Sequence, residues 1–264
     1  MAKRYAVFIY GTAAYLLFLA VFLYAIGFIG NFGVPKSLDS PAQVGWQTAL
    51  AVDVALLSLF ALQHSIMARR GFKRFLTRFI PPSAERSTYV AASSLALALL
   101  FWKWEPLGGI VWQVDSWAGR ASLYAGYGFG WLLVLVATFA INHFDLFGLR
   151  QVWTQLRSRP QAAVRFSTPI LYRMVRHPLY LGWLFVFWST PDMTASHMFF
   201  AAMTTAYILV AIRFEEADLI REHPEYSVYR TQVPMLLPRL TGPVRSAGTT
   251  PRPAAARATA GSGR

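Results

Sequence analysis

Long runs of apolar residues, separated by short polar segments, divide most of the chain into six stretches. The runs cover residues 5–29, 48–67, 89–102, 122–142, 179–189 and 195–212. A helix needs about 20 consecutive apolar residues to cross the hydrocarbon core of a bilayer. The pattern therefore predicts an all-α, polytopic transmembrane bundle of about six spans.

The fifth run is the exception, because residues 179–189 are short of that length. This run crosses only if the polar turn before it, residues 170–178, contributes to the span; the alternative is one arm of a tilted hairpin. The sixth run continues beyond residue 212 as a polar helix that reaches residue 222. The last polar segment, residues 241–264, is rich in Ala, Gly, Pro and Arg and is predicted to be a disordered basic tail on a membrane-embedded domain of residues 1–240.

Composition supports a membrane protein. Of the 264 residues, 55% are hydrophobic and 16% aromatic, which exceeds what a soluble domain of this size buries. The chain has no cysteine, which excludes disulfides, thiolate metal sites and a cysteine nucleophile. Any reacting sulfur must therefore come from a substrate or a cofactor.

The net charge of +13 comes from Lys and Arg residues whose distribution along the chain indicates an orientation in the membrane. We therefore expect no nucleic-acid partner. With six crossings, all but three of the 25 Lys and Arg residues lie on one side of the membrane; the exceptions are Lys36, Lys103 and Arg120. Positive charge favours the cytoplasmic side. We therefore expect an integral protein of a bacterial inner membrane with both termini in the cytoplasm.

The same topology gathers unusual polar residues at the cytosolic ends of the spans. Each alone could simply reach the headgroup boundary, but the set favours a site. It comprises Gln63, His64, Asn142, His143, Asp145, Arg176, His177, Glu215 and Glu216. Asp53 differs because it lies inside the second run, where an ionisable residue is costly and usually faces a polar cavity. Asp53 and His64 share a helix face about 16 Å apart, so both could line one cavity without touching.

Two groups of residues resemble a known family. Arg176-His177-Pro178-Leu179-Tyr180-Leu181-Gly182, followed by Phe214-Glu215-Glu216, Tyr226, Tyr229 and Pro234, resembles the cofactor signature of the isoprenylcysteine carboxyl methyltransferase superfamily. Its members are membrane-embedded enzymes that use S-adenosylmethionine. The upstream segments Leu62-Gln63-His64-Ser65 and Asn142-His143-Phe144-Asp145 are similar to its NnrU-like branch. The resemblance covers most of residues 5–238.

This resemblance implies that residues 170–238 bind S-adenosylmethionine. Arg176 is suited to the carboxylate of the cofactor, because a guanidinium is a planar fork of donors. Glu215 or Glu216 would accept from the ammonium or the ribose, since adjacent helical residues point about 100° apart and one of them can face inward. The remaining cofactor candidates are His177, Pro178, Tyr180, Gly182, Tyr226 and Tyr229, the tyrosines for the adenine or the sulfonium.

The resemblance also implies the methyl acceptor, methanethiol, which would yield dimethyl sulfide and S-adenosylhomocysteine by in-line displacement. A thiol reacts as its thiolate, so a base is needed. His64 or His143 is a candidate general base, and Asp145 is a candidate to orient His143. Gln63, Asn142 and Asp53 are the candidate substrate-binding residues. No metal is implied.

Three alternatives remain open. The acceptor could be another membrane-accessible substrate, such as an isoprenylcysteine carboxylate, a phospholipid amine or a different thiol. His64, His143 and His177 could instead form a three-histidine metal or haem site in a membrane protein of another class. The third alternative is a non-catalytic family member that retains only the helices. The oligomeric state is not predicted.

Overall fold

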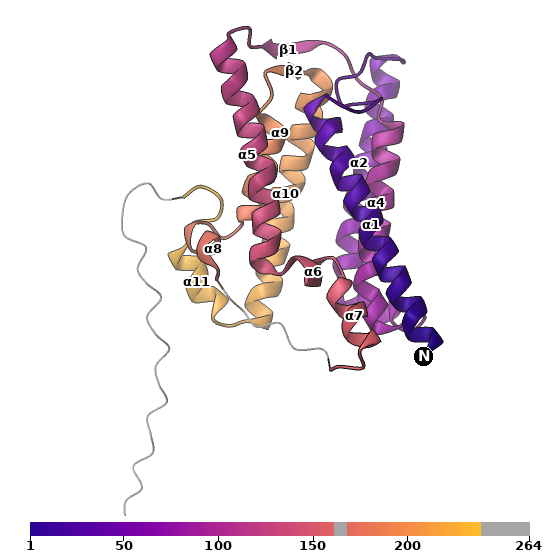
Figure 1. Cartoon of the computed structure of the whole chain (residues 1–264). Coiled ribbons are helices and arrows are strands. Elements are labelled where there is room, and N and C mark those ends of the chain that lie inside the picture. Colours follow the sequence, from indigo (N-terminus) through magenta and orange to yellow (C-terminus); the bar gives the residue numbers. More distant parts are fainter. Residues whose placement is uncertain (161–167, 239–264) are drawn as a thin grey trace, which may run out of the picture.

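The computed structural model describes residues 1–160 and 168–238, which form an all-α bundle with a small two-stranded sheet (Figure 1). The expected tail, residues 241–264, lies outside the described residues. In the described part, four helices are long and apolar enough to cross a bilayer: α1 (Ala2–Gly30), α2 (Trp46–Ala68), α5 (Trp117–Ile141) and α10 (Ala195–Glu222). The protein is an integral membrane protein.

The third and fifth apolar runs form α4 (Glu85–Lys103) and α9 (Pro178–Trp188). With 11 residues, α9 rises about 16 Å, roughly half the thickness of a hydrocarbon core. The preceding turn does not lengthen it, because α8 (Ile170–Met174) is a separate helix and Val175 is extended. The number of crossings therefore stays a prediction.

The long helices form two groups (Figure 1). In one group α4 packs against α1 and α2, and in the other α9 packs along α5 and against α10. The α5–α9 contact is close because Gly130 and Gly182 face each other. Contacts between α10 and α2 join the two groups.

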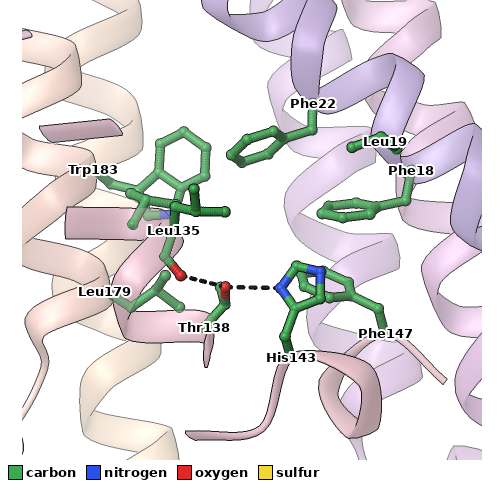
Figure 2. A pocket seen from close by; sticks show the side chains of 10 residues that line it. Phe18, Leu19, Phe22, Leu135, Thr138, His143, Phe147, Leu179 and Trp183 are labelled. Atoms are coloured by element: carbon green, nitrogen blue, oxygen red, sulfur yellow. Dashed lines mark hydrogen bonds between the residues drawn. The ribbon is translucent and has the colours of Figure 1, made fainter. Parts of the chain in front are cut away.

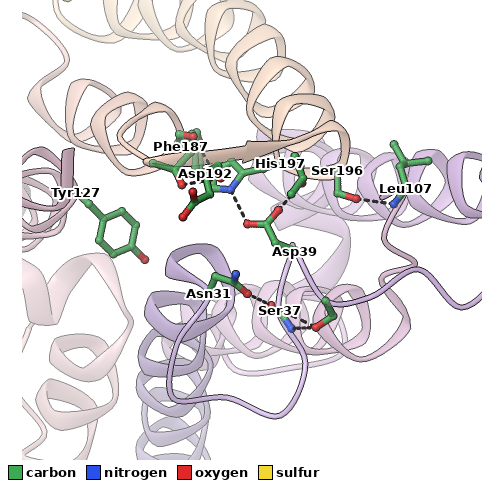
Figure 3. Close-up of polar contacts among 12 residues, drawn as sticks. Asn31, Ser37, Asp39, Leu107, Tyr127, Phe187, Asp192, Ser196 and His197 are labelled. Carbon is green, nitrogen blue, oxygen red and sulfur yellow. Dashed lines mark hydrogen bonds and ion pairs between the residues drawn. The ribbon is translucent and has the colours of Figure 1, made fainter. Parts of the chain in front are cut away.

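One end of the bundle carries a ribbon that the apolar pattern did not predict. Strand β1 (Ile110–Gln113) pairs antiparallel with β2 (Asp192–Thr194), and both lie in the segments between the apolar runs. Beside this ribbon, His197 Nδ1 lies 3.2 Å from Asp39 Oδ2 and His197 Nε2 lies 3.0 Å from the Phe187 carbonyl oxygen (Figure 3). These contacts tie the loop after α1 to α9 and α10.

The other end, at which α1 begins, is called the N-terminal end here. It carries the short elements α3 (Arg70–Leu76), η1 (Pro82–Ala84), α6 (His143–Leu146), α7 (Leu149–Leu156) and α11 (Tyr226–Gln232) (Figure 1). The polar segment between the fourth and fifth apolar runs is thus partly helical, as α6 and α7. Its Val152 is buried against Gly11 of α1, where a Cβ would come within 2.7 Å of the valine methyl groups.

Candidate active site

A tight turn after α5 directs His143 back into the bundle. Asn142 has φ 150° and ψ 86°, a region that residues with side chains rarely adopt. Its side-chain oxygen accepts the backbone N–H of Asp145 at 3.3 Å and so caps α6. His143, the first residue of α6, is 7% exposed. Asn142, a predicted substrate ligand, thus has a structural role in placing this histidine.

Two hydroxyl groups hold the His143 ring. Thr138 Oγ1 donates to the Leu135 carbonyl oxygen at 2.7 Å and lies 2.9 Å from His143 Nδ1. A hydroxyl has a single proton, so Thr138 must accept from Nδ1–H, and the lone pair of the neutral ring is on Nε2. The Tyr15 hydroxyl, 2.9 Å from Nε2, is therefore the donor to it.

The surroundings of His143 are apolar. Its ring stacks on Phe139 with centroids 4.3 Å apart and planes 7° apart. Burial lowers the pKa of His143 below its ordinary value of 6.5. The imidazole is accordingly neutral at pH 7, the state that a general base requires.

His143 borders a cavity of about 190 Å³ between the two groups of helices (Figure 2). The cavity is lined by Phe18, Leu19, Phe22, Val134, Leu135, Thr138, His143, Phe147, Leu179 and Trp183. Among these residues, all within the described part of the chain, His143 is the one ionisable side chain. The space suits a small apolar molecule with one group that interacts with a base.

Asp145, expected to orient His143, is turned away from it. Its carboxylate accepts from Gln151 Nε2 at 2.8 Å and from Arg150 Nη1 at 3.3 Å. These bonds connect α6 to α7. The expectation that Asp145 binds His143 was wrong, because the Asp145 carboxylate faces α7. Thr138 and Tyr15 bind the imidazole instead.

His64 belongs to a separate polar cluster between α2 and α4. Its Nε2 lies 2.8 Å from the Tyr89 hydroxyl and its Nδ1 lies 3.2 Å from Ser93 Oγ. Gln63 donates to the same Ser93 hydroxyl at 3.3 Å. His64 and His143, the two candidate bases, therefore have different partners.

Tyr180 and Glu215 meet beside that cluster. The Tyr180 hydroxyl donates to Glu215 Oε2 at 2.9 Å, and Glu215 is exposed. Leu179, one position earlier on α9, lines the His143 cavity. Because successive helical residues point about 100° apart, the cavity and the Tyr180–Glu215 pair lie on adjacent faces of α9.

Glu216 faces inward and is 4% exposed. Its Oε1 accepts from Arg176 Nε at 2.7 Å, from His177 Nε2 at 3.0 Å and from the Tyr226 hydroxyl at 3.3 Å. Its Oε2 lies 3.1 Å from Arg230 Nε. Arg176 also donates to the carbonyl oxygens of Arg230 and Val233. Glu216 and Arg176 thus connect α11 and the segment after it to α10. They also connect this segment to the start of α9.

Comparison with known proteins places the chain in one family, with matches that cover 89% of its length. It is 54% identical over 237 residues to methanethiol S-methyltransferase of Crocosphaera subtropica, covering 89% of this chain and 93% of that protein. It is 51% identical over 237 residues to the protein of the same name in Mycobacterium tuberculosis, covering 89% and 97%. The chain belongs to the methanethiol S-methyltransferase family. It is therefore a methyltransferase.

A more distant relative is Nurim of Sus scrofa, 31% identical over 204 residues, which cover 71% of this chain and 78% of Nurim. No family model and no solved structure matches the chain. Family membership thus rests on sequence similarity over most of the chain.

Several predicted cofactor residues of this methyltransferase occupy structural positions. Pro178 is the first residue of α9 and is buried, and Gly182 lies against α5. The Tyr229 hydroxyl donates to the Tyr172 carbonyl oxygen, and burial raises the pKa of Tyr229 to about 12, which keeps this donor protonated. Tyr226 is 2% exposed. These residues shape the N-terminal end of the bundle.

Asp53 is not brought together with the other candidates. It is fully buried at the ribbon end, where its Oδ1 accepts the backbone N–H of Glu105 at 2.9 Å, just after α4 ends. His64 lies three helical turns away toward the opposite end. Asp53 therefore caps a backbone group on the far side of the bundle from His143.

The three-histidine alternative is not formed. His64, His143 and His177 each have a different set of hydrogen-bond partners. Within the described ranges, no group of three or more His, Cys, Asp or Glu side chains is arranged to hold a metal ion.

Sequence reasoning missed the two residues that hold His143. Tyr15 is one of many aromatic residues in the first apolar run, and nothing in that run distinguishes it. Thr138 lies five residues before His143, beyond the usual helical contact spacing, and reaches it only because the chain turns at Asn142. The aromatic lining residues carried no signal for the same reason, since lipid-facing and cavity-facing aromatics look alike in sequence.

Proposed function

We propose that this methyltransferase transfers the methyl group of S-adenosylmethionine to methanethiol in the His143 cavity, giving dimethyl sulfide and S-adenosylhomocysteine. The names of the relatives support the acceptor. The observation that carries the proposal is the cavity, an apolar space of about 190 Å³ with a neutral imidazole on its wall. A small apolar thiol needs such a space and such a base.

The chemical step is an in-line displacement. The thiol loses its proton to His143 Nε2, either through the Tyr15 hydroxyl or after this hydroxyl moves aside, because Tyr15 is bound to that nitrogen. The sulfur then forms its bond to the methyl carbon as the bond from that carbon to the donor sulfur breaks. Thr138 keeps the proton on Nδ1, so Nε2 is the nitrogen that accepts.

Some of the predicted cofactor residues near α9 are accessible to the methyl donor, and others are already engaged within the protein. The donor supplies an electrophilic methyl group on a sulfonium. Glu215 has an exposed carboxylate suited to an ammonium or ribose hydroxyls, and Tyr180 orients it. Arg176 fits the donor carboxylate less well than the sequence suggested, because Glu216 and two carbonyl oxygens already engage its guanidinium. We assign Arg176, His177 and Glu216 to positioning and Glu215 with Tyr180 to donor binding.

The orientation of the protein is part of the proposal. The N-terminal end of the bundle carries His143 and Glu215 together with the basic helix α3 and Arg150 of α7, so we expect this end in the cytosol by the positive-inside rule. There it would meet a water-soluble donor, while the thiol partitions into the bilayer. A cysteine introduced at Arg74, on α3, should react with a membrane-impermeant maleimide in inverted vesicles and stay unlabelled in intact cells.

The direct test uses the full chain in lipid nanodiscs with labelled S-adenosylmethionine and methanethiol, and measures dimethyl sulfide in the headspace. We expect dimethyl sulfide from the wild type and a rate about 100-fold lower in His143→Gln, the scale of a lost general base. His64→Gln is the comparison variant, and both variants should elute as monodisperse species. Absence of dimethyl sulfide with the wild type would refute the function, and a greater loss in His64→Gln would move the base to His64.

A further inference from the structure

The His143 cavity has a polar end and an apolar end. Figure 2 shows His143 and Thr138 at one end, and Phe22 and Trp183 at the other. Leu19 and Leu135 close the sides from α1 and α5 and are themselves 38% and 42% exposed on the outer surface. A thiol whose sulfur meets the base at His143 would therefore direct its carbon substituent toward Phe22 and Trp183.

Phe22 and Trp183 line the apolar end of the cavity, and the ring of Trp131 packs against both of them. Phe22 of α1 meets Trp131 of α5 edge-on at 5.1 Å, and Trp131 meets Trp183 of α9 at 5.2 Å. Edge-to-face contacts of this kind are favourable and hold the rings in fixed orientations. The depth of the cavity measured from His143 is thus set by a rigid wall.

The cavity is larger than methanethiol requires. An engineered apolar cavity of about 150 Å³ in another protein binds benzene. The cavity here measures about 190 Å³ and has the same kind of lining, with a polar group at one end. By volume, this space holds a phenyl ring together with an adjoining sulfur atom.

We infer that the cavity also accepts larger apolar thiols, up to the size of benzenethiol, with the sulfur at His143 and the substituent against Phe22 and Trp183. This activity rests on the proposed methyl transfer. The S–H proton passes to His143, the thiol sulfur gains a bond to the methyl carbon, and the bond from this carbon to a sulfonium donor breaks. The products are a methyl thioether and the demethylated donor. Leu19 and Leu135 then limit the size of the acceptor.

Binding is tested without catalysis by the thermal stability of the full chain in nanodiscs, with and without thioanisole, the methyl thioether of benzenethiol. A ligand that binds only the folded state raises the melting temperature. We expect a rise for the wild type that is lost in Leu19→Phe and Leu135→Phe, which fill the cavity. The matched controls are Leu23→Phe and Leu132→Phe, on the same two helices, outside the lining and both 58% exposed. Equal shifts in all four variants would mean partition into lipid and would overturn the inference.

Activity is tested with methanethiol and benzenethiol in parallel. We expect both to be methylated by the wild type. In Leu19→Phe and Leu135→Phe, the ratio of kcat/KM for benzenethiol to kcat/KM for methanethiol should fall at least tenfold, whereas Leu23→Phe and Leu132→Phe should leave this ratio unchanged. Methylation of methanethiol alone by the wild type overturns the inference and leaves the proposed function intact. Failure with both thiols refutes the proposed function and with it the inferred methylation; the thioanisole measurement then decides only whether the cavity binds a phenyl thioether.

Discussion

Gly182 of α9 and Gly130 of α5 lie backbone against backbone. A Cβ on Gly182 would come within 2.9 Å of the Gly130 carbonyl oxygen, and a Cβ on Gly130 within 2.8 Å of the Gly182 carbonyl oxygen. These atoms are main chain and cannot rotate away. The close approach places Leu179 and Trp183 of the short helix at the cavity, so Gly182, predicted from its motif as a cofactor residue, has a packing role.

Gly182→Ala should therefore force the two helices apart and destabilise the bundle. Overpacking of this kind costs about 1–3 kcal/mol. Thermal unfolding in nanodiscs measures the effect, and Gly128→Ala on α5 is the matched control, since a Cβ there meets nothing within 4 Å. An unchanged melting temperature with weakened donor binding would instead favour a cofactor role for Gly182.

Thr138→Val should slow methyl transfer about tenfold or more while the protein stays folded. The substitution keeps the shape of the side chain but removes the acceptor of His143 Nδ1–H, so the ring no longer has a fixed tautomer. Thr138→Ser keeps a hydroxyl and should restore the rate. Nitrogen NMR of labelled histidine reads the tautomer directly, and a wild-type spectrum in Thr138→Val would contradict the assignment.

The rate of methyl transfer should fall as the pH is lowered, with a midpoint below the ordinary imidazole pKa of 6.5. Burial lowers the pKa of His143 from 6.5, so the basic form persists to lower pH than in a free imidazole. The pH profile of kcat/KM checks this expectation. In His143→Gln the acid limb should disappear; its persistence would assign that limb to another group.

The lowered pKa of His143 also makes the free energy of unfolding depend on pH. The folded pKa of His143 lies below the unfolded value, so the folded state binds fewer protons and loses free energy of unfolding as the pH falls below about 6.5. Chemical unfolding of wild type and His143→Gln at pH 7.5 and pH 5.5 measures this contribution. The wild type should lose more stability than the variant over this interval.

Glu216→Gln should loosen α11 from the bundle. The substitution leaves Arg176, whose side chain is 10% exposed, without its carboxylate partner, and breaking a buried ion pair costs about 3–5 kcal/mol. Hydrogen exchange of residues 226–238 should then rise. Glu215→Gln is the control because Glu215 is exposed, and it should instead weaken donor binding. Equal exchange in both variants would show that Glu216 does not hold this segment.

The helices were largely predictable from sequence. The first apolar run was expected at residues 5–29 and forms α1 (Ala2–Gly30), because burial of apolar surface in lipid depends on a contiguous local pattern. The inward turn of one glutamate also followed from helical geometry: Glu216 is buried and Glu215 is exposed. Which of the two turned inward depended on the neighbours of α10, which the sequence does not show.

Sequence by itself determined the membrane class, the approximate positions of the helices, the family and the presence of His143 at a helix end, since all of these depend on local composition or on motifs. Tertiary structure alone decided that Tyr15 and Thr138 hold His143, that Asp145 does not, and that Phe22 and Trp183 close the cavity. The physical reason is that these contacts join residues of different helices, several of them far apart in the sequence. These contacts join residues from α1, α5, α6 and α9, and their distances depend on how closely the helices pack, as between Gly130 and Gly182, which no local pattern encodes.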